Sequence, residues 1–262
     1  MANHYQPSAV LKDRAKGFLN GKYAGAIGIT AVYIVLYFVA SNILSDISTG
    51  VVYLFVKMGA VSFAASVLNY VIGIVLSGAA TVIVSVLMLG MSYYYLVLGS
   101  GQFPRLSDLF YGFRENAGRN IAASFMINIP LILSLMPGIL AGRLYMDTKE
   151  RSYALAAVIL GTAGLVLYFF FDISLKMTYF IIADFPEYTA SEAVKAGWRK
   201  MSGHRMRLFG LMLSFIPYFI LGILSFGIGL LWVYPLVQES YAQFYLDLMN
   251  PKKVSDEWER TV

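Results

Sequence analysis

The sequence predicts an all-α fold: a polytopic membrane bundle of six transmembrane helices with interfacial amphipathic helices on the cytoplasmic side. Two observations lead to this prediction. Hydrophobic residues make up 58% of the 262 residues and charged residues only 13%, whereas a soluble domain is about half apolar and about a quarter charged. Several apolar runs are also long enough to cross the roughly 30 Å hydrocarbon core of a bilayer as helices.

Composition also excludes several classes of function. The chain has no cysteine, and its two histidines, His4 and His204, lie far apart in the sequence. We therefore expect neither a metal site nor a cofactor. The motifs of zinc proteases, serine hydrolases and P-loop enzymes do not occur, and no connecting loop can hold a catalytic domain, so the chain is not expected to be an enzyme. The net charge of +5 comes from basic residues between the apolar runs, which indicates membrane topology and not nucleic-acid binding.

Six apolar runs are predicted to span the membrane within one domain covering the whole chain. The run from 51 to 68 is shorter and is interrupted by Lys57. We expect it to form a re-entrant or interfacial helix on the outer side, with an additional span as the alternative. The six predicted spans are 24–44, 69–98, 121–142, 153–183, 208–224 and 230–249.

Three polar segments are predicted to be amphipathic helices on the membrane surface: 8–20, 106–116 and 189–203. For the first, a solvated tail is the alternative. Because each precedes an odd-numbered span, the chain resembles three copies of an interfacial helix followed by a hairpin, although convergence explains the pattern equally well. The last helix and the residues after it carry an aromatic anchor and cations that suit anionic headgroups. These predicted surface residues are Lys195, Trp198, Arg199, Lys200, Arg205 and Arg207.

The distribution of Lys and Arg predicts the orientation. Fifteen of the 20 basic residues fall on the side of the two termini, four fall on the other side, and Lys176 lies within a span. Since positively charged loops stay in the cytoplasm, both termini are expected there. This orientation requires an even number of spans.

Four polar side chains are predicted to share one layer of the bundle. Asp172 and Lys176 are one helical turn apart in the fourth span, and ionisable residues inside a membrane often mark a functional site. Counting the helical rise from the cytoplasmic ends places Glu239 and Asn128 at a similar depth, roughly 10–16 Å. Lys176 is then able to bridge the two carboxylates. The layer is either a binding or proton-coupled site, or an ion-pair network that holds the bundle together.

The sixth predicted span presents a face of hydrogen-bonding side chains: Tyr234, Gln238, Tyr241 and Tyr245. This face either lines a groove for an amphiphile or packs against neighbouring helices. The GxxxG motif from Gly138 to Gly142 favours close helix packing, within the chain or with a second copy.

Several motifs resemble the bacterial domain-of-unknown-function family 975. They are LSDLFYGF at 106–113, MPGI at 136–139, an ADxPE-type turn at 183–187, the FGIGLLW turn, Pro235 and a closing FYxDL at 244–248. The resemblance implies a polytopic membrane protein, mainly of Gram-positive bacteria, with no established activity. The chain is more distantly similar to the membrane part of some glycerophosphodiesterases, which implies a connection with lipids.

Three functional hypotheses follow. The leading one is a non-enzymatic protein that binds a lipid or peptide in a polar cavity of the bundle. The second is a small secondary transporter that uses Asp172, Lys176 and Glu239. The third is a scaffold that recruits membrane proteins. The expected partners are membrane lipids, with a membrane-protein partner or a second copy of the chain as further possibilities.

Overall fold

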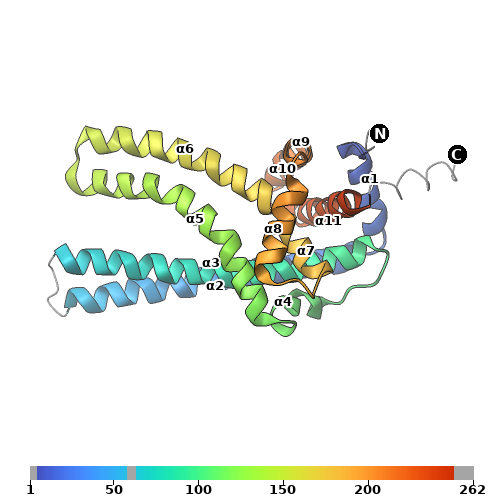
Figure 1. Cartoon of the computed structure of the whole chain (residues 1–262), viewed down its shortest axis with the longest axis horizontal. Helices are drawn as coiled ribbons and strands as arrows, with labels where there is room; N and C mark the ends of the chain where they lie inside the picture. Colours follow the sequence, from blue (N-terminus) through green and yellow to red (C-terminus); the bar gives the residue numbers. More distant parts are fainter. Residues whose placement is uncertain (1–4, 58–62, 251–262) are drawn as a thin grey trace, which may run out of the picture.

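The structure is a computed structural model of the chain, which describes residues 5–57 and 63–250. All regular elements in these ranges are helical, and no strand occurs among them, so the all-α fold is confirmed (Figure 1). In chain order the elements are α1 (Ser8–Leu19), α2 (Tyr23–Lys57), α3 (Phe63–Gly99), the 3-10 helix η1 (Leu106–Phe110), α4 (Tyr111–Arg114), α5 (Ala117–Thr148), α6 (Arg151–Leu175), α7 (Thr178–Asp184), α8 (Ala190–Met201), α9 (Arg205–Leu213), α10 (Ile216–Leu224) and α11 (Leu230–Met249).

Two long antiparallel hairpins, α2–α3 and α5–α6, extend in the same direction from the rest of the molecule (Figure 1). Small residues bring α5 and α6 together. A Cβ atom on Gly138 would lie only 2.6 Å from Gly161 Cα, and one on Gly164 only 2.3 Å from the Ser134 carbonyl oxygen. The GxxxG motif therefore packs α5 against α6 of the same chain, as small residues do in membrane helices.

The separate helix predicted over 51–68 is wrong for the residues that the structure describes. Residues 51–57 continue α2, and residues 63–68 begin α3. The connection between them, 58–62, lies outside the described residues. Lys57 does not interrupt the helix, since it belongs to α2 as the structure describes it. With 35 residues, α2 is about 52 Å long.

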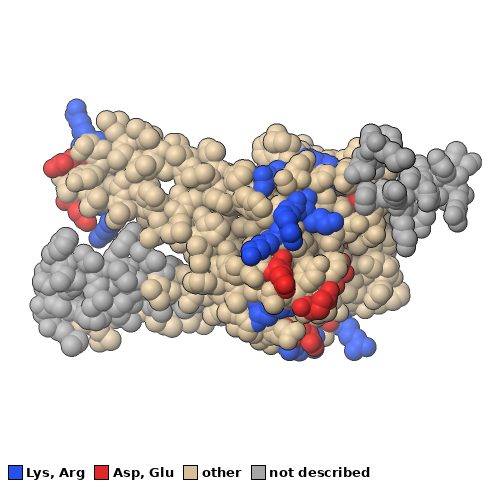
Figure 2. Space-filling view, viewed as in Figure 1, with Lys and Arg blue, Asp and Glu red and all other residues tan. Residues whose placement is uncertain are grey.

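The predicted span 153–183 is two helices, α6 and α7, separated at Lys176 and Met177. Residues 120–142 of α5 and 152–171 of α6 contain no charged side chain. We call these two stretches the uncharged band; in α6 it is about 30 Å long, which matches the hydrocarbon core. Figure 2 shows charged side chains at the far end of this hairpin and around α8, with uncharged surface between them.

The ion-pair residues lie where the uncharged band of α6 ends, next to the break between α6 and α7. Asp172 occupies the last turn of α6, and Lys176 is its C-terminal cap residue. The depth of roughly 16 Å predicted for Asp172 assumes one continuous helix ending near Ala183, and it stays a prediction.

The core is formed where the second half of α3 meets α11, with α1, α2, α5 and α7 packed around them. Tyr95, Phe244 and Tyr245 are among its largest fully buried side chains. In contrast, most apolar side chains of α6 before Ile173 are exposed or only partly buried, whereas Phe180 and Ile181 of α7 lie in the core.

Among the residues that the structure describes, five helical stretches are long and apolar enough to cross a membrane: α2, α3, α5, α6–α7 and α9–α10. The predicted sixth span, α11, is not among them and is not confirmed. Its second half carries Glu239 and Asp247 and is buried in the core. The α10–α11 turn is apolar, and Phe226 at its tip is 97% exposed.

Candidate functional site

Asp172 and Lys176 form an ion pair at the end of α6. Lys176 Nζ lies 3.1 Å from Asp172 Oδ2 and 5.8 Å from the centre of the Tyr241 ring on α11. The Asp172 side chain is 22% exposed and the Lys176 side chain 21%. A cation at a helix C-terminus also interacts favourably with the helix dipole. The pair thus links α6 to α11 and remains partly accessible.

Glu239 lies apart from this pair. Its Oε1 accepts a hydrogen bond from Gln243 Nε2 at 2.8 Å, while Oε2 is buried without a partner among the described residues. Gln243 Nε2 also lies 3.3 Å from the Gly99 carbonyl oxygen, which it can reach as a donor. The predicted bridge from Lys176 to Glu239 is wrong. Lys176 forms an ion pair with Asp172, whereas the hydrogen bond to Glu239 Oε1 comes from Gln243.

Asn128 belongs to another polar group, between α3, α5 and α7. Its Nδ2 donates to Ser85 Oγ and to the Ser124 carbonyl oxygen, each at 2.7 Å. The Tyr179 side chain of α7 lies beside Ser85 and Asn128. The four predicted polar side chains therefore do not form a single hydrogen-bonded cluster. Within the described residues no group of three or more His, Asp or Glu side chains is placed to hold a metal ion.

The tyrosine face of α11 packs against other helices. Tyr234 stacks on Tyr33 of α2, with ring centres 6.5 Å apart. Tyr245 stacks on Phe180 of α7 at 5.4 Å and donates a hydrogen bond to Asp184 at 2.7 Å. Gln238 and Tyr241 are buried as well. These contacts agree with the second alternative for this face, which is packing against neighbouring helices.

Helix α8 is fixed at both its start and its middle. The Thr189 side chain caps the first turn, and the Glu192 carboxylate accepts a hydrogen bond from the Thr189 backbone N–H at 2.9 Å. These bonds from Thr189 hold the pKa of Glu192 below its usual value of 4.5. Gly197 allows close packing, because a Cβ atom there would lie 2.1 Å from Thr178 Oγ1 on α7.

The turn before α8 is held by Arg119, which the sequence prediction missed. The two terminal nitrogens of Arg119 donate to the carbonyl oxygens of Ile182, Phe185, Pro186 and Tyr188 at 2.6–3.3 Å. A charged guanidinium can satisfy several carbonyls at once because its donors form a rigid fork. The only signal in the sequence is the position of Arg119 in a polar segment directly before an apolar run.

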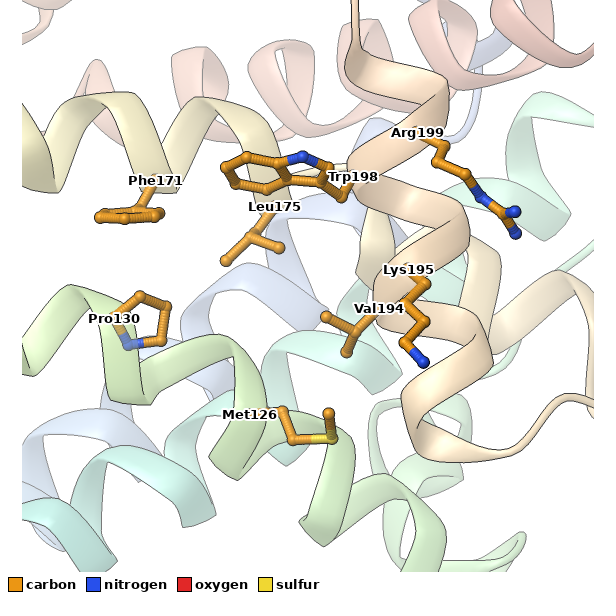
Figure 3. Close-up of a pocket in the computed structure, with 8 residues that line it drawn as sticks. All are labelled: Met126, Pro130, Phe171, Leu175, Val194, Lys195, Trp198 and Arg199. Atoms are coloured by element: carbon orange, nitrogen blue, oxygen red, sulfur yellow. The ribbon is translucent and has the colours of Figure 1, made fainter.

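A pocket of about 430 Å³ lies between α5, α6 and α8. In Figure 3, Trp198 and Val194 point from α8 towards Phe171 and Leu175 on α6, while the charged ends of Lys195 and Arg199 turn away from this apolar lining. The complete lining is Met126, Pro130, Phe171, Leu175, Val194, Lys195, Trp198 and Arg199. Three of the six predicted surface residues therefore line the pocket, and none of Asp172, Lys176 and Glu239 does.

Pro130 accounts for the space between the helices. It has no backbone N–H for the Met126 carbonyl, and its ring clashes with that carbonyl in a straight helix, so proline bends a helix. Both residues line the pocket. In Figure 1, α5 runs beside α6 at the far end of the hairpin and diverges from it towards α8.

The remaining predicted surface residues differ in their contacts. Arg205 stacks on Trp198 and Phe170, with its guanidinium 4.7 Å and 4.9 Å from the two ring centres. Lys200 is exposed on α8. Arg207, however, forms an ion pair with the buried Asp247 and donates to the Gln6 carbonyl oxygen at 2.9 Å. Arg207 thus joins α9 to α11 and to the N-terminal segment instead of presenting its charge to the surface.

Comparison with known families gives one match. Residues 1–252 match the family model described as a protein of unknown function, DUF975. The chain is a member of the DUF975 family. The resemblance noted in the sequence is thereby confirmed. No curated protein and no solved structure matches the chain.

The motifs that connect the chain to DUF975 have structural roles. The ADxPE-type turn is the segment whose carbonyls Arg119 holds. The LSDLFYGF motif packs on α3 without space for larger residues, since a Cβ atom on Gly90 would meet the Leu109 carbonyl oxygen. In the FGIGLLW turn, Gly227 adopts φ 82°, a left-handed conformation that glycine accommodates most easily. Of these motifs, the ADxPE-type turn directly precedes α8, one of the helices that line the pocket of this DUF975 protein.

Proposed function

We propose that this DUF975 protein is a non-enzymatic protein of the bacterial cytoplasmic membrane that binds an amphiphilic ligand, a lipid or a peptide, in the pocket between α5, α6 and α8. The proposal includes cytoplasmic termini and a location of α1, α4 and α8 at the cytoplasmic surface. The observation that carries it is the pocket itself, with an apolar lining from α5 and α6 and two cations on α8.

The dimensions and position of the pocket support this proposal. Small-molecule sites commonly have volumes of about 300–1,000 Å³, with mostly apolar linings and a few polar groups. At about 430 Å³, this pocket is large enough for one apolar chain. It also adjoins the edge of the uncharged band, where an amphiphile has its apolar part in hydrocarbon and its polar part near water.

The pocket is a better candidate than the polar layer predicted from the sequence. Residues at i and i+4 of a helix share a face. The lining residues Phe171 and Leu175 therefore share one face of α6, and Asp172 and Lys176 share a different one. Asp172 and Lys176 already satisfy each other, and Glu239 is sealed in the core.

Native mass spectrometry of the protein, extracted in mild detergent, tests the proposal. We expect a retained amphiphile on the wild type and its loss in Val194→Phe, which fills the pocket. Val166→Phe is the matched control, since Val166 is 70% exposed on α6. An unchanged complement of ligand in Val194→Phe, or a wild type that neither retains nor accepts any amphiphile, would contradict the proposal.

A secondary transporter is the second candidate, because one observation favours it. Glu239 has a fully buried oxygen without a partner among the described residues, and a buried uncompensated carboxylate is costly enough to favour its neutral form. Transport by this route requires an ion flux in reconstituted vesicles that Glu239→Gln abolishes. Equal flux in both proteins would remove this candidate.

A further inference from the structure

We infer that the ligand of the pocket is an anionic glycerophospholipid, with its phosphate between Lys195 and Arg199 and one acyl chain against α5 and α6. This inference rests on the proposed function and names the chemical class of its ligand.

The two pocket cations form a suitable site for a phosphate. Lys195 and Arg199 are one turn apart on α8 and therefore share a face. Both are exposed, and the ion pairs formed by the described residues involve neither of them. Figure 2 shows Lys and Arg side chains gathered over this part of the molecule. Arginine and lysine donors form strong charge-assisted hydrogen bonds with phosphate oxygens.

Trp198 marks the boundary between the apolar and charged parts of the site. Its indole points towards the α6 side of the pocket (Figure 3), and Arg205 stacks on it with the guanidinium 4.7 Å from the ring centre. Arg205 Nε is buried without a hydrogen-bond partner among the described residues. The stacking fixes the indole and adds a third positive charge near the site. Three cations close together favour an anion over a zwitterion of the same shape.

The other wall of the pocket suits a hydrocarbon chain. Met126, Pro130, Phe171 and Leu175 carry no charged group, and Phe171 is the last residue of the uncharged band. A chain entering from the bilayer therefore meets apolar side chains until it reaches α8. Because the pocket requires an apolar chain attached to an anion, a free phosphate satisfies only half of the site.

The inference is tested by titrating the purified full-length protein in a neutral detergent and counting bound lipids by native mass spectrometry. The probes are phosphatidylglycerol and phosphatidylcholine with identical acyl chains, each with and without excess inorganic phosphate. We expect tighter binding of phosphatidylglycerol and no displacement by inorganic phosphate. Lys195→Gln and Arg199→Gln should each weaken phosphatidylglycerol binding up to about fivefold, because an exposed ion pair with the phosphate has an effect of this order.

Lys200→Gln is the matched control, because it removes the same charge from the same helix outside the pocket lining. We expect less than about a twofold change, since a neutral micelle lacks the surface potential that acts on every cation of a membrane protein. Equal weakening by Lys200→Gln, or displacement of the lipid by inorganic phosphate, overturns the inference.

The outcomes separate the inference from the proposed function. Equal binding of both lipids, with loss of both in Val194→Phe, overturns the anionic specificity and leaves amphiphile binding intact. Binding of neither lipid overturns both. A thermal melt of each variant shows whether it is folded, and the three cation substitutions are at exposed positions, where they disturb packing least.

Discussion

Arg119 provides the most direct prediction about the support of α8. Its donors reach four backbone carbonyls of the turn between α7 and α8. Arg119→Lys keeps the charge, but a lysine on the same backbone reaches about one of them. Water can solvate the exposed Pro186 carbonyl, whereas those of Ile182, Phe185 and Tyr188 are partly buried. Two lost charge-assisted bonds at about 1.5 kcal/mol each give a loss of about 3 kcal/mol.

The assay is thermal unfolding of the purified protein in detergent. For a chain of this size, about 3 kcal/mol corresponds to a fall in Tm of roughly 6–12 °C. Arg114→Lys is the control, because its 3.8 Å ion pair with Asp108 is at the surface and such pairs contribute little. If Arg119→Lys melts within about 1 °C of the wild type, as the control should, the carbonyl contacts do not hold α8 and the reasoning is refuted.

Three further predictions concern packing, topology and pH. Gly197→Ala should destabilise the protein by about 1–3 kcal/mol in thermal melts through overpacking against α7, whereas Gly210→Ala, which has open space, should not; equal melts would contradict this. We expect the uncharged α10–α11 turn to lie in hydrocarbon, so a cysteine replacing Phe226 should resist an impermeant maleimide from both membrane faces, while one replacing Lys149 should react; equal labelling would refute this location. The pKa of Glu192 is lowered in the folded state, so the contribution of its carboxylate to folding stability is present above pH 4.5 and is lost as pH falls through the folded pKa. The Tm difference between the wild type and Glu192→Gln should therefore close in that range. A difference that persists at low pH would count against the cap.

Local sequence patterns were sufficient to predict much of the fold. Long apolar runs identified the helices of both hairpins, and the threonine cap with a glutamate three residues later marks the start of α8. The GxxxG motif correctly indicated close packing, although only the structure shows that its partner is α6 of the same chain. The residue types at Lys195, Trp198 and Arg199 also indicated a surface that suits anionic groups. These three residues line the pocket.

The arrangement of the polar residues was not predictable in the same way. Helical rise gives depth only along a continuous helix, and the break at Lys176 moved the ion pair to the end of α6. Depth also does not show which way a side chain faces. The sequence therefore grouped Glu239 with Asp172 and Lys176, whereas its carboxylate accepts a hydrogen bond from Gln243. Arg119 acts on carbonyls 63–69 residues away, which no local pattern indicates. The pocket depends on the divergence of α5 from α6, a tertiary feature.

The central claim is that a lipid occupies the space between α5, α6 and α8. The most direct test is photocrosslinking of the full-length protein in vesicles with phosphatidylglycerol carrying a diazirine in one acyl chain, followed by peptide mapping. We predict adducts concentrated on Met126, Pro130 and Val194 and their loss in Val194→Phe with retention in Val166→Phe. Adducts spread evenly along the exposed face of α6, with no enrichment at the pocket and no effect of Val194→Phe, would contradict the claim.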